Sequence, residues 1–287
     1  MIYFRTSRVI IITLFAGIAA CSFKLLYNNL DELIPDYVED FVTLDDVLEQ
    51  KFEQRTLLLL DWHRNTQLRQ YADWMRAVQQ DIGVELTIEK AGQRIDEVEA
   101  FWVAISERIN DEMANLLPLL SEQQQQELFS NLAESNADFR EEYIDIDEAD
   151  RRDQYYEDLY ETYESWIGAL SDEQDDAINK ASHMLVSTAE LRLQRRMDWQ
   201  NGIQEILKKQ DSNEYKSQRL HNFLTGFENS VNKAMQEKSV YNRKIIAQLT
   251  VQISLKMSQV QKDFFISRTD EYIRIFTELA EKSGSTL

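Results

Sequence analysis

Apolar residues recur at intervals of three and four positions along most of this chain of 287 residues. That spacing places them on one face of an α-helix, so each such segment has one stripe to bury. A cap at Thr43 or Asp45 begins a long predicted helix that ends at Gly83. The next helix is predicted from Thr87 to Pro118. Further helices are predicted over 121–144, 147–168, 171–209, 213–236 and 239–282, the last with a break near residue 257.

The composition supports an all-helical protein. Seven glycines and two prolines are few for this length, and strands and tight turns depend on both. We therefore predict an all-α fold, either a multi-helix bundle or an elongated helical array of about eight helices. The same scarcity excludes a Gly-rich phosphate loop and a G-x-S-x-G nucleophile elbow.

The N-terminus has the pattern of an export signal. Arg5 and Arg8 precede a short apolar run over residues 9–20, which ends in small residues. As a helix the run would reach about 18 Å, short of the roughly 30 Å hydrocarbon core of a bilayer. We predict a signal peptide over residues 1–20.

The run ends at Cys21, the only cysteine of the chain. The sequence Ile18-Ala19-Ala20-Cys21 resembles the lipobox of bacterial lipoproteins, which implies lipidation at Cys21 as the new N-terminus. An ordinary secretory signal or an uncleaved anchor helix are the competing interpretations. By analogy with enteric lipoproteins, Ser22 favours the outer membrane, facing the periplasm. The mature chain would then have a lipidated tether and short helix over 21–42, with a helical domain over 43–287.

Charge is unevenly distributed along the mature chain. Residues 21–120 carry 20 acidic and 9 basic residues, a net charge of −11, and residues 121–180 carry 19 and 4, a net charge of −15. Residues 181–287 carry 12 and 16, a net charge of +4. The helical domain could therefore form an acidic lobe over 43–180 and a mildly basic lobe over 181–287. The two lobes could attract each other, or the acidic lobe could attract a basic client. The overall sign argues against nucleic acid as a partner.

One short motif occurs three times, as Leu120–Gln124, Leu170–Gln174 and Met257–Gln261. Each has serine followed three residues later by glutamine, which predicts a capping box at a helix start. Such a cap stabilises a helix by about 1 kcal/mol, which explains the motif without any functional role. The motif L-[ST]-x-x-Q also resembles the hallmark of Spy/CpxP-like periplasmic stress proteins, which implies chaperone-like binding of unfolded clients.

A second resemblance extends over more of the chain. The segments Cys21–Leu30, Asp61–Arg64 and Asn136–Tyr143 are similar to a family of all-helical proteobacterial lipoproteins of unknown function. This resemblance implies a fold class and a location in the bacterial envelope, and no activity.

The three histidines, His63, His183 and His221, are too far apart in sequence to form an i, i+4 metal pair on one helix. His63 follows Trp62 and precedes Arg64. It is either a pH-sensitive or ligand-contacting residue, or a histidine hydrogen-bonded where two helices meet. We expect no metal site and no cofactor.

A row of aromatic residues follows one predicted helix rich in acidic residues. Tyr156, Tyr163 and Trp166 share the face that core packing explains. Tyr155 and Tyr160 could lie outside that face and form a peptide-binding surface. With Trp62 and His63 they are the candidate partner-binding residues.

Acidic pairs such as Glu141-Glu142, Asp145/Asp147 and Asp175-Asp176 give no sign of the separated pKa values that a hydrolase needs. We therefore assign no catalytic residue and predict a non-enzymatic, membrane-anchored protein that binds envelope proteins in a chaperone-like or scaffolding role. The alternative is an envelope hydrolase acting on peptidoglycan or lipid. An apolar concave surface with aromatics would favour binding. A deep cleft with two convergent carboxylates, or with His63 beside one, would favour catalysis.

Overall fold

A computed structural model describes residues 20–228, 230 and 232–281. These residues form eleven α-helices, one short 3₁₀ turn and no strand, which confirms the all-α fold class. The predicted export signal up to residue 19 lies outside the described residues, as does the side chain of Cys21. The helices are α2 (Ala20–Asn28), α3 (Leu30–Glu39), α4 (Asp46–Val84), α5 (Ile88–Leu116), α6 (Glu122–Tyr143), α7 (Glu148–Ile167), α8 (Asp172–Met184), α9 (Ala189–Leu207), α10 (Asn213–Glu228), α11 (Lys233–Leu255) and α12 (Gln259–Glu281).

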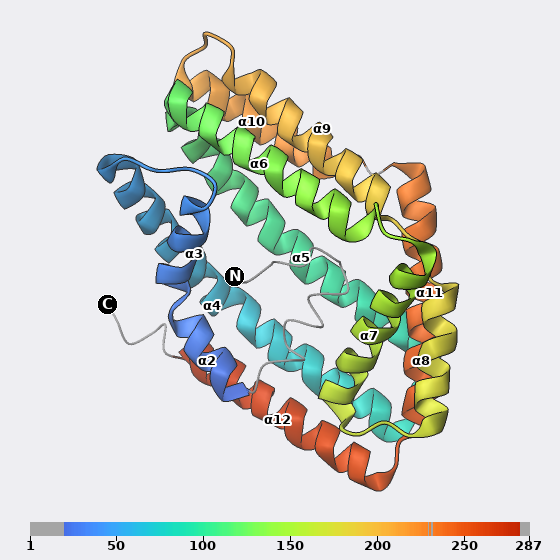
Figure 1. The fold of residues 1–287 in the computed structure, drawn as a ribbon. Coiled ribbons are helices and arrows are strands. Elements are labelled where there is room, and N and C mark those ends of the chain that lie inside the picture. Colours follow the sequence, from blue (N-terminus) through green and yellow to red (C-terminus); the bar gives the residue numbers. More distant parts are fainter. Residues whose placement is uncertain (1–19, 229, 231, 282–287) are drawn as a thin grey trace.

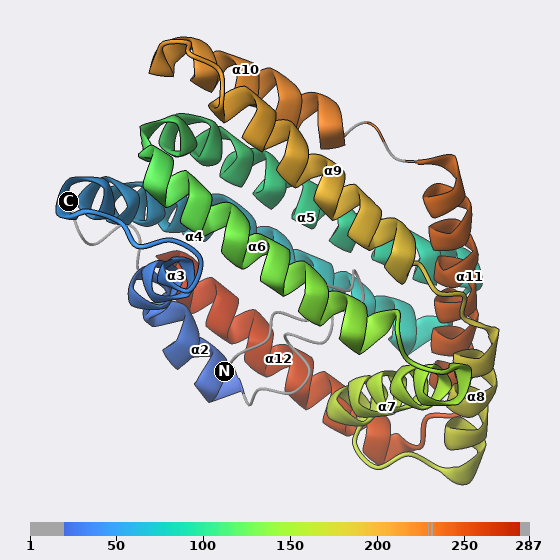
Figure 2. The same cartoon turned by 45° about the horizontal axis from the view of Figure 1, so that its top comes forward.

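Two long antiparallel helices, α4 and α5, form the centre of the array (Figure 1). Helix α12 packs along α4, and α10 and α11 pack against α5. In both views α6, α9 and α10 lie side by side at one edge, while α12 lies at the opposite edge next to α2 (Figure 1 and Figure 2). Helix α8 packs against α11, and α7 packs against both α8 and α12, so these helices close one end of the array.

The helix starts follow the predicted caps. The Asp45 side chain accepts hydrogen bonds from the backbone N–H groups of Val47 (3.2 Å) and Leu48 (3.1 Å) at the start of α4. Thr87 caps α5 in the same way, accepting from Lys90 at 3.2 Å. Helix α5 ends two residues before Pro118, which lies in the 3₁₀ turn. Local polar chemistry therefore determined these boundaries.

The prediction of one helix over 171–209 is wrong, because the chain breaks between α8 and α9. The backbone N–H of Val186 donates to the Asn242 side chain at 2.9 Å, and Asn242 donates back to the Val186 carbonyl at 2.8 Å. Arg152 donates to the Leu185 carbonyl at 2.6 Å. These side chains, distant in sequence, replace the helical hydrogen bonds that the linker gives up.

The segment 213–236 also differs from the prediction. Helix α10 ends at Glu228, and α11 begins at Lys233 with Asn232 as its cap. The predicted break near residue 257 is confirmed, since α11 ends at Leu255 and α12 begins at Gln259.

The segment 21–42, expected to be a tether with a short helix, forms α2 and α3 and packs on the rest of the array. Tyr27 and Val42 are each only 4% exposed. The ring centroids of Phe23 and Phe276 lie 5.6 Å apart, so contact with α12 begins in the first turn of α2. Residues of this segment, such as Phe23, Tyr27 and Val42, therefore pack against the rest of the array.

The three predicted capping boxes are present. Ser121 and Ser171 each exchange hydrogen bonds with the glutamine three residues on. Ser258 and Gln261 do the same, at 2.9 and 3.2 Å. Gln174 and Gln261 also bond to each other, with the Gln261 side-chain amide donating to the Gln174 carbonyl oxygen at 2.8 Å. This buried pair joins the start of α8 to the start of α12.

Helices from both sides of residue 180 pack together throughout the array, as α4 does with α12. Ion pairs join the acidic and basic parts of the sequence. Arg243 of α11 pairs with Asp96 of α5, and Lys256 pairs with Glu173 of α8 at 2.8 Å. Opposite charges therefore meet within the fold.

Candidate functional site

An apolar cavity of about 430 Å³ lies between α4, α5, α7, α11 and α12, with α2 at one end. Residues that define it are Tyr71, Trp74, Val78, Phe101, Trp102 and Trp166. We call this space the apolar chamber. Its size falls in the range of about 300–1,000 Å³ that is usual for small-molecule pockets.

The helical repeat explains why the chamber wall is apolar. On α4 the lining residues Leu68, Tyr71, Met75, Val78 and Ile82 follow one another at three or four positions, so they share one face. The matching stripe on α5 faces them from the other side of the chamber. The apolar stripes on α4 and α5, which predict buried helix faces, therefore form the two long walls of the chamber.

His63 lines the end of the chamber next to α2. Its Nδ1 atom lies 2.8 Å from the Tyr27 hydroxyl, and its Nε2 atom lies 3.1 Å from the Tyr71 hydroxyl. Burial, helped by the nearby Arg64 charge, lowers the pKa of His63 to about 4. The imidazole is therefore neutral near pH 7, where one nitrogen donates and the other accepts.

Burial also raises the pKa of the Tyr27 phenol to about 12 and shifts that of Tyr71 upward. Neither ring nitrogen of His63 bonds to a carboxylate, because the two tyrosine hydroxyls occupy both. The structure therefore matches the interpretation of His63 as a histidine hydrogen-bonded where two helices meet, here α2 and α4. Its role as a ligand-contacting residue stays a prediction.

The other candidate residues lie elsewhere. Trp62 is half-buried, with its ring centroid 6.3 Å from that of His63. Tyr155 and Tyr160 are half-buried against the cluster formed by α7, α8 and α11. These three are not among the described residues that line the chamber. Their role as partner-binding residues stays a prediction.

The sequence analysis missed the tryptophans that shape the chamber. The indole N–H of Trp74 donates to the Arg94 carbonyl at 3.1 Å, which fixes the ring against α5. Trp166 packs on Tyr272 with ring centroids 5.6 Å apart. At helical spacing such residues indicate a core, and nothing in the sequence separates a filled core from a hollow one.

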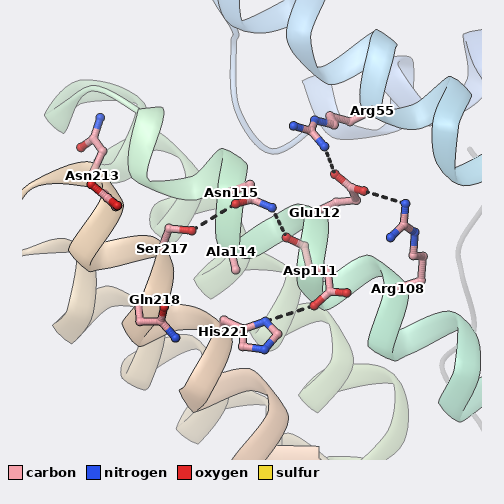
Figure 3. Close-up of a pocket in the computed structure, with 11 residues that line it drawn as sticks. Arg55, Arg108, Asp111, Glu112, Ala114, Asn115, Asn213, Ser217, Gln218 and His221 are labelled. Atoms are coloured by element: carbon pink, nitrogen blue, oxygen red, sulfur yellow. Dashed lines mark hydrogen bonds and ion pairs between the residues drawn. The ribbon is translucent and has the colours of Figure 1, made fainter.

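A second, polar cavity of about 720 Å³ lies between the N-terminal part of α4, the last turns of α5 and the start of α10 (Figure 3). Its charged and polar residues include Arg55, Arg108, Asp111, Glu112, Ser217 and His221. We call it the polar groove. Glu112, 8% exposed, lies 3.4 Å from both Arg55 and Arg108, measured between the closest oxygen and nitrogen atoms.

The groove is not arranged like a nucleophilic centre. His221 Nδ1 lies 3.1 Å from the Asp111 carboxylate, and both side chains are about half exposed. The Ser217 hydroxyl donates to Asn115 at 3.1 Å (Figure 3). An activated serine needs its base within hydrogen-bond reach. The groove therefore has the features of an ion-paired, solvated helix contact.

Within the described residues, no group of three or more His, Cys, Asp or Glu side chains is placed to hold a metal ion. None of the helices from α2 onward combines the length and hydropathy needed to cross a bilayer.

Comparison with known proteins identifies a family. Residues 40–236 match the family described as "Family of unknown function (DUF6279)", which is more than half of the chain. The chain therefore belongs to this family, and its predicted membership in an uncharacterised helical family is confirmed. No curated protein and no solved structure gives a significant match. The resemblances to lipoproteins and to Spy/CpxP-like proteins stay predictions.

Proposed function

We propose that this DUF6279 member is a lipid-anchored protein of the bacterial envelope, facing the periplasm, that binds a hydrophobic guest without catalysing a reaction. The apolar chamber carries the proposal. Three tryptophans and several other aromatic residues line it, and apolar burial is the main source of affinity in such pockets. His63 faces this chamber as a neutral group bonded to two phenols, which favours binding over acid–base chemistry.

The size of the chamber argues for an occupant. Apolar side chains that line such a space make fewer packing contacts than those in a filled core. A guest of matching shape would restore those contacts.

The anchor is proposed at Cys21, the second residue of α2. Because Phe23 already packs on α12, little free chain separates the lipid from the folded body. Acyl chains on Cys21 would hold the chamber close to the membrane surface. Two or more acyl chains give stable anchoring, whereas one gives only reversible binding.

Replacing Cys21 tests the anchor. Cys21→Ala should leave a protein without acyl chains, so that labelled palmitate no longer enters it. If the substituted protein is labelled as strongly as the wild type, the proposed anchor is wrong. That result would not bear on binding in the chamber.

A blocked chamber tests the binding. Val78→Trp places a large ring in the chamber, and Val84→Trp makes the same change at a site that is 85% exposed on the same helix. An uncharged naphthylamine dye that fluoresces in apolar surroundings is the probe. Val78→Trp should weaken its binding about tenfold or more, equivalent to about 1.4 kcal/mol, while Val84→Trp should bind as the wild type does.

Ser254→Phe provides a second block from α11, for the case that Val78→Trp unfolds. The circular dichroism melt shows which variants are folded. A folded variant of either kind that binds the dye with wild-type affinity would contradict the proposed function.

A further inference from the structure

The polar side chains that line the apolar chamber already have hydrogen-bond partners. The Tyr163 hydroxyl pairs with Thr250 at 2.8 Å. Thr269 donates to the Phe265 carbonyl at 2.8 Å, and Ser254 donates to the Val251 carbonyl at 2.8 Å. The exception is the buried indole N–H of Trp166, which has no partner among the described residues.

The charged member of the lining is also paired. Arg94 donates from Nε to Asp81 at 2.8 Å and from Nη1 to Glu97 at 2.7 Å. Lys90 lies 3.0 Å from the same Asp81 carboxylate. Two of the three guanidinium nitrogens of Arg94 are therefore already bonded to carboxylates.

These pairings restrict the chemistry of the guest. Each residue of a bound peptide brings a backbone N–H and a C=O that need partners, and a buried group left unpaired costs about 1–3 kcal/mol. The chamber offers almost no free hydrogen-bond partner for such groups, because its polar side chains are already bonded. A hydrocarbon chain brings no such groups and loses nothing by entering.

The shape of the chamber points to a long guest. Its wall on α4 extends from His63 to Ile82, about 28 Å at roughly 1.5 Å per residue. A volume of 430 Å³ spread over that length makes a slot that is much longer than it is wide. An unbranched chain fits such a slot.

One residue marks where the slot meets solvent. Trp102 is 46% exposed and is the exposed member of the described lining residues. Tryptophan suits such a place, because its ring is apolar and its N–H can face water. A guest with one polar end would leave that end at Trp102.

We propose that the guest is a single long, unbranched acyl chain of a free fatty acid or single-chain lipid, held with its polar end at Trp102. This rests on the proposed function and adds the chemical class and direction of the guest. The protein would then hold, beside the membrane, a chain that water does not dissolve.

A chain-length series tests the class. Saturated fatty acids of increasing length compete with the naphthylamine dye for the full chain held in phospholipid nanodiscs. Affinity, corrected for the fraction of each acid that enters the nanodisc lipid, should rise about fourfold per added methylene, from about 0.8 kcal/mol per buried CH₂. It should level off when the chamber is full. A corrected affinity independent of length, or displacement of the dye by a hydrophobic peptide, would overturn the proposal.

Brominated fatty acids test the direction, because bromine quenches only tryptophans that it touches. Bromine near the carboxylate should quench Trp102, and this quenching should fall as the bromine is moved toward the methyl end. Trp102→Phe should remove the part of the quenching that depends on the bromine position. Trp199, which packs in the separate cluster of α9 and α10, is the control, and Trp199→Phe should leave that dependence unchanged. Quenching that does not depend on the bromine position would contradict the proposed direction.

The source of the chain is a separate arm of the experiment. Wild-type protein and Cys21→Ala should bind added fatty acid equally, since the guest is a free lipid. If Cys21→Ala binds and the lipidated protein does not, the chamber holds the protein's own anchor and the free-lipid proposal fails. If the dye binds in the chamber but no fatty acid displaces it, the acyl class fails while the proposed function stands.

Discussion

Helix α5 takes part in two cavities of opposite character. Its residues 91–105 form one wall of the apolar chamber, and its residues 108–115 form one wall of the polar groove. In the groove, Glu112 pairs with Arg55 of α4 and with Arg108, and Asp111 lies next to His221 of α10. Arg55, Arg108, Asp111 and His221 remain partly exposed. In the chamber the polar groups pair among themselves and leave the open space apolar.

The difference shows which cavity needs an explanation. A solvated groove between charged helices can fill with water, which bonds to its walls. An apolar space gives water no partners, so it is unfavourable unless a guest or a functional demand maintains it. For this reason the apolar chamber carries the functional proposal.

The largest expected effect is a difference in the free energy of unfolding between a chamber variant and a groove variant. Trp166→Ala should lower the free energy of unfolding by about 3–5 kcal/mol, because it removes a large ring that packs on Tyr272. Asp111→Ala in the groove should lower it by less than about 1 kcal/mol, because Asp111 and its partner His221 are both about half exposed. Urea unfolding measures both. Equal losses would mean that the chamber wall and the groove wall do not differ in packing.

The pH dependence of stability tests the polar end of the chamber. Burial lowers the pKa of His63 to about 4 from its ordinary value of 6.5, so the folded protein favours the neutral imidazole. Stability is complete above about pH 6.5 and is lost as the pH falls toward 4, because the unfolded chain takes up the proton first. From about pH 7.5 to about pH 5 this loss should be about 2 kcal/mol.

His63→Gln removes this titration and is the variant to compare. It should be less stable than the wild type at pH 7.5, with a shallower decline toward pH 5. An unchanged slope in urea unfolding across this range would show that His63 is not held neutral in the chamber.

The capping boxes should affect stability without affecting either cavity. Ser121→Ala and Ser171→Ala should each lower the free energy of unfolding by about 1 kcal/mol. Gln174→Ala should exceed both, because it also leaves Gln261 without its buried partner. Dye binding should stay at the wild-type level in all three. A large loss of binding at an unchanged melting temperature would give the motif a functional role.

The smallest expected effect on the chamber comes from the acidic helix α7. Asp153, Glu157, Glu161 and Glu164 are all exposed and repeat along one side of α7. Neutralising all four should leave dye binding unchanged. It should weaken capture of a basic unfolded protein at low salt, where the field extends over about 10 Å or more. Unchanged capture and unchanged salt dependence would remove the support for chaperone-like clients.

Much of the fold could be predicted from the sequence, because helix starts depend on neighbouring residues. Asp45 and Thr87 cap their helices through bonds that span only two or three positions. The break between α8 and α9 could not be predicted in this way. It depends on Asn242, which lies 56 positions after Val186 in the chain.

The chamber could not be predicted from the sequence, for a similar reason. Its walls come from helices spread between α2 and α12, and each helix alone shows only an apolar stripe. Whether such stripes close on each other or leave a space depends on how the helices cross. The second role of Gln174, its bond to Gln261, depends likewise on two distant helix starts meeting.

The central claim, that the apolar chamber is the binding site, is tested most directly by mapping a bound apolar probe. A long-chain fatty acid carrying a photoactivatable diazirine is irradiated with the full chain, and the labelled residues are identified by mass spectrometry. The account predicts labels on α4 between residues 63 and 82, on α5 between 91 and 105, and on α7 between 159 and 167. Labels confined to residues 108–115 and 213–221, the walls of the polar groove, would contradict it.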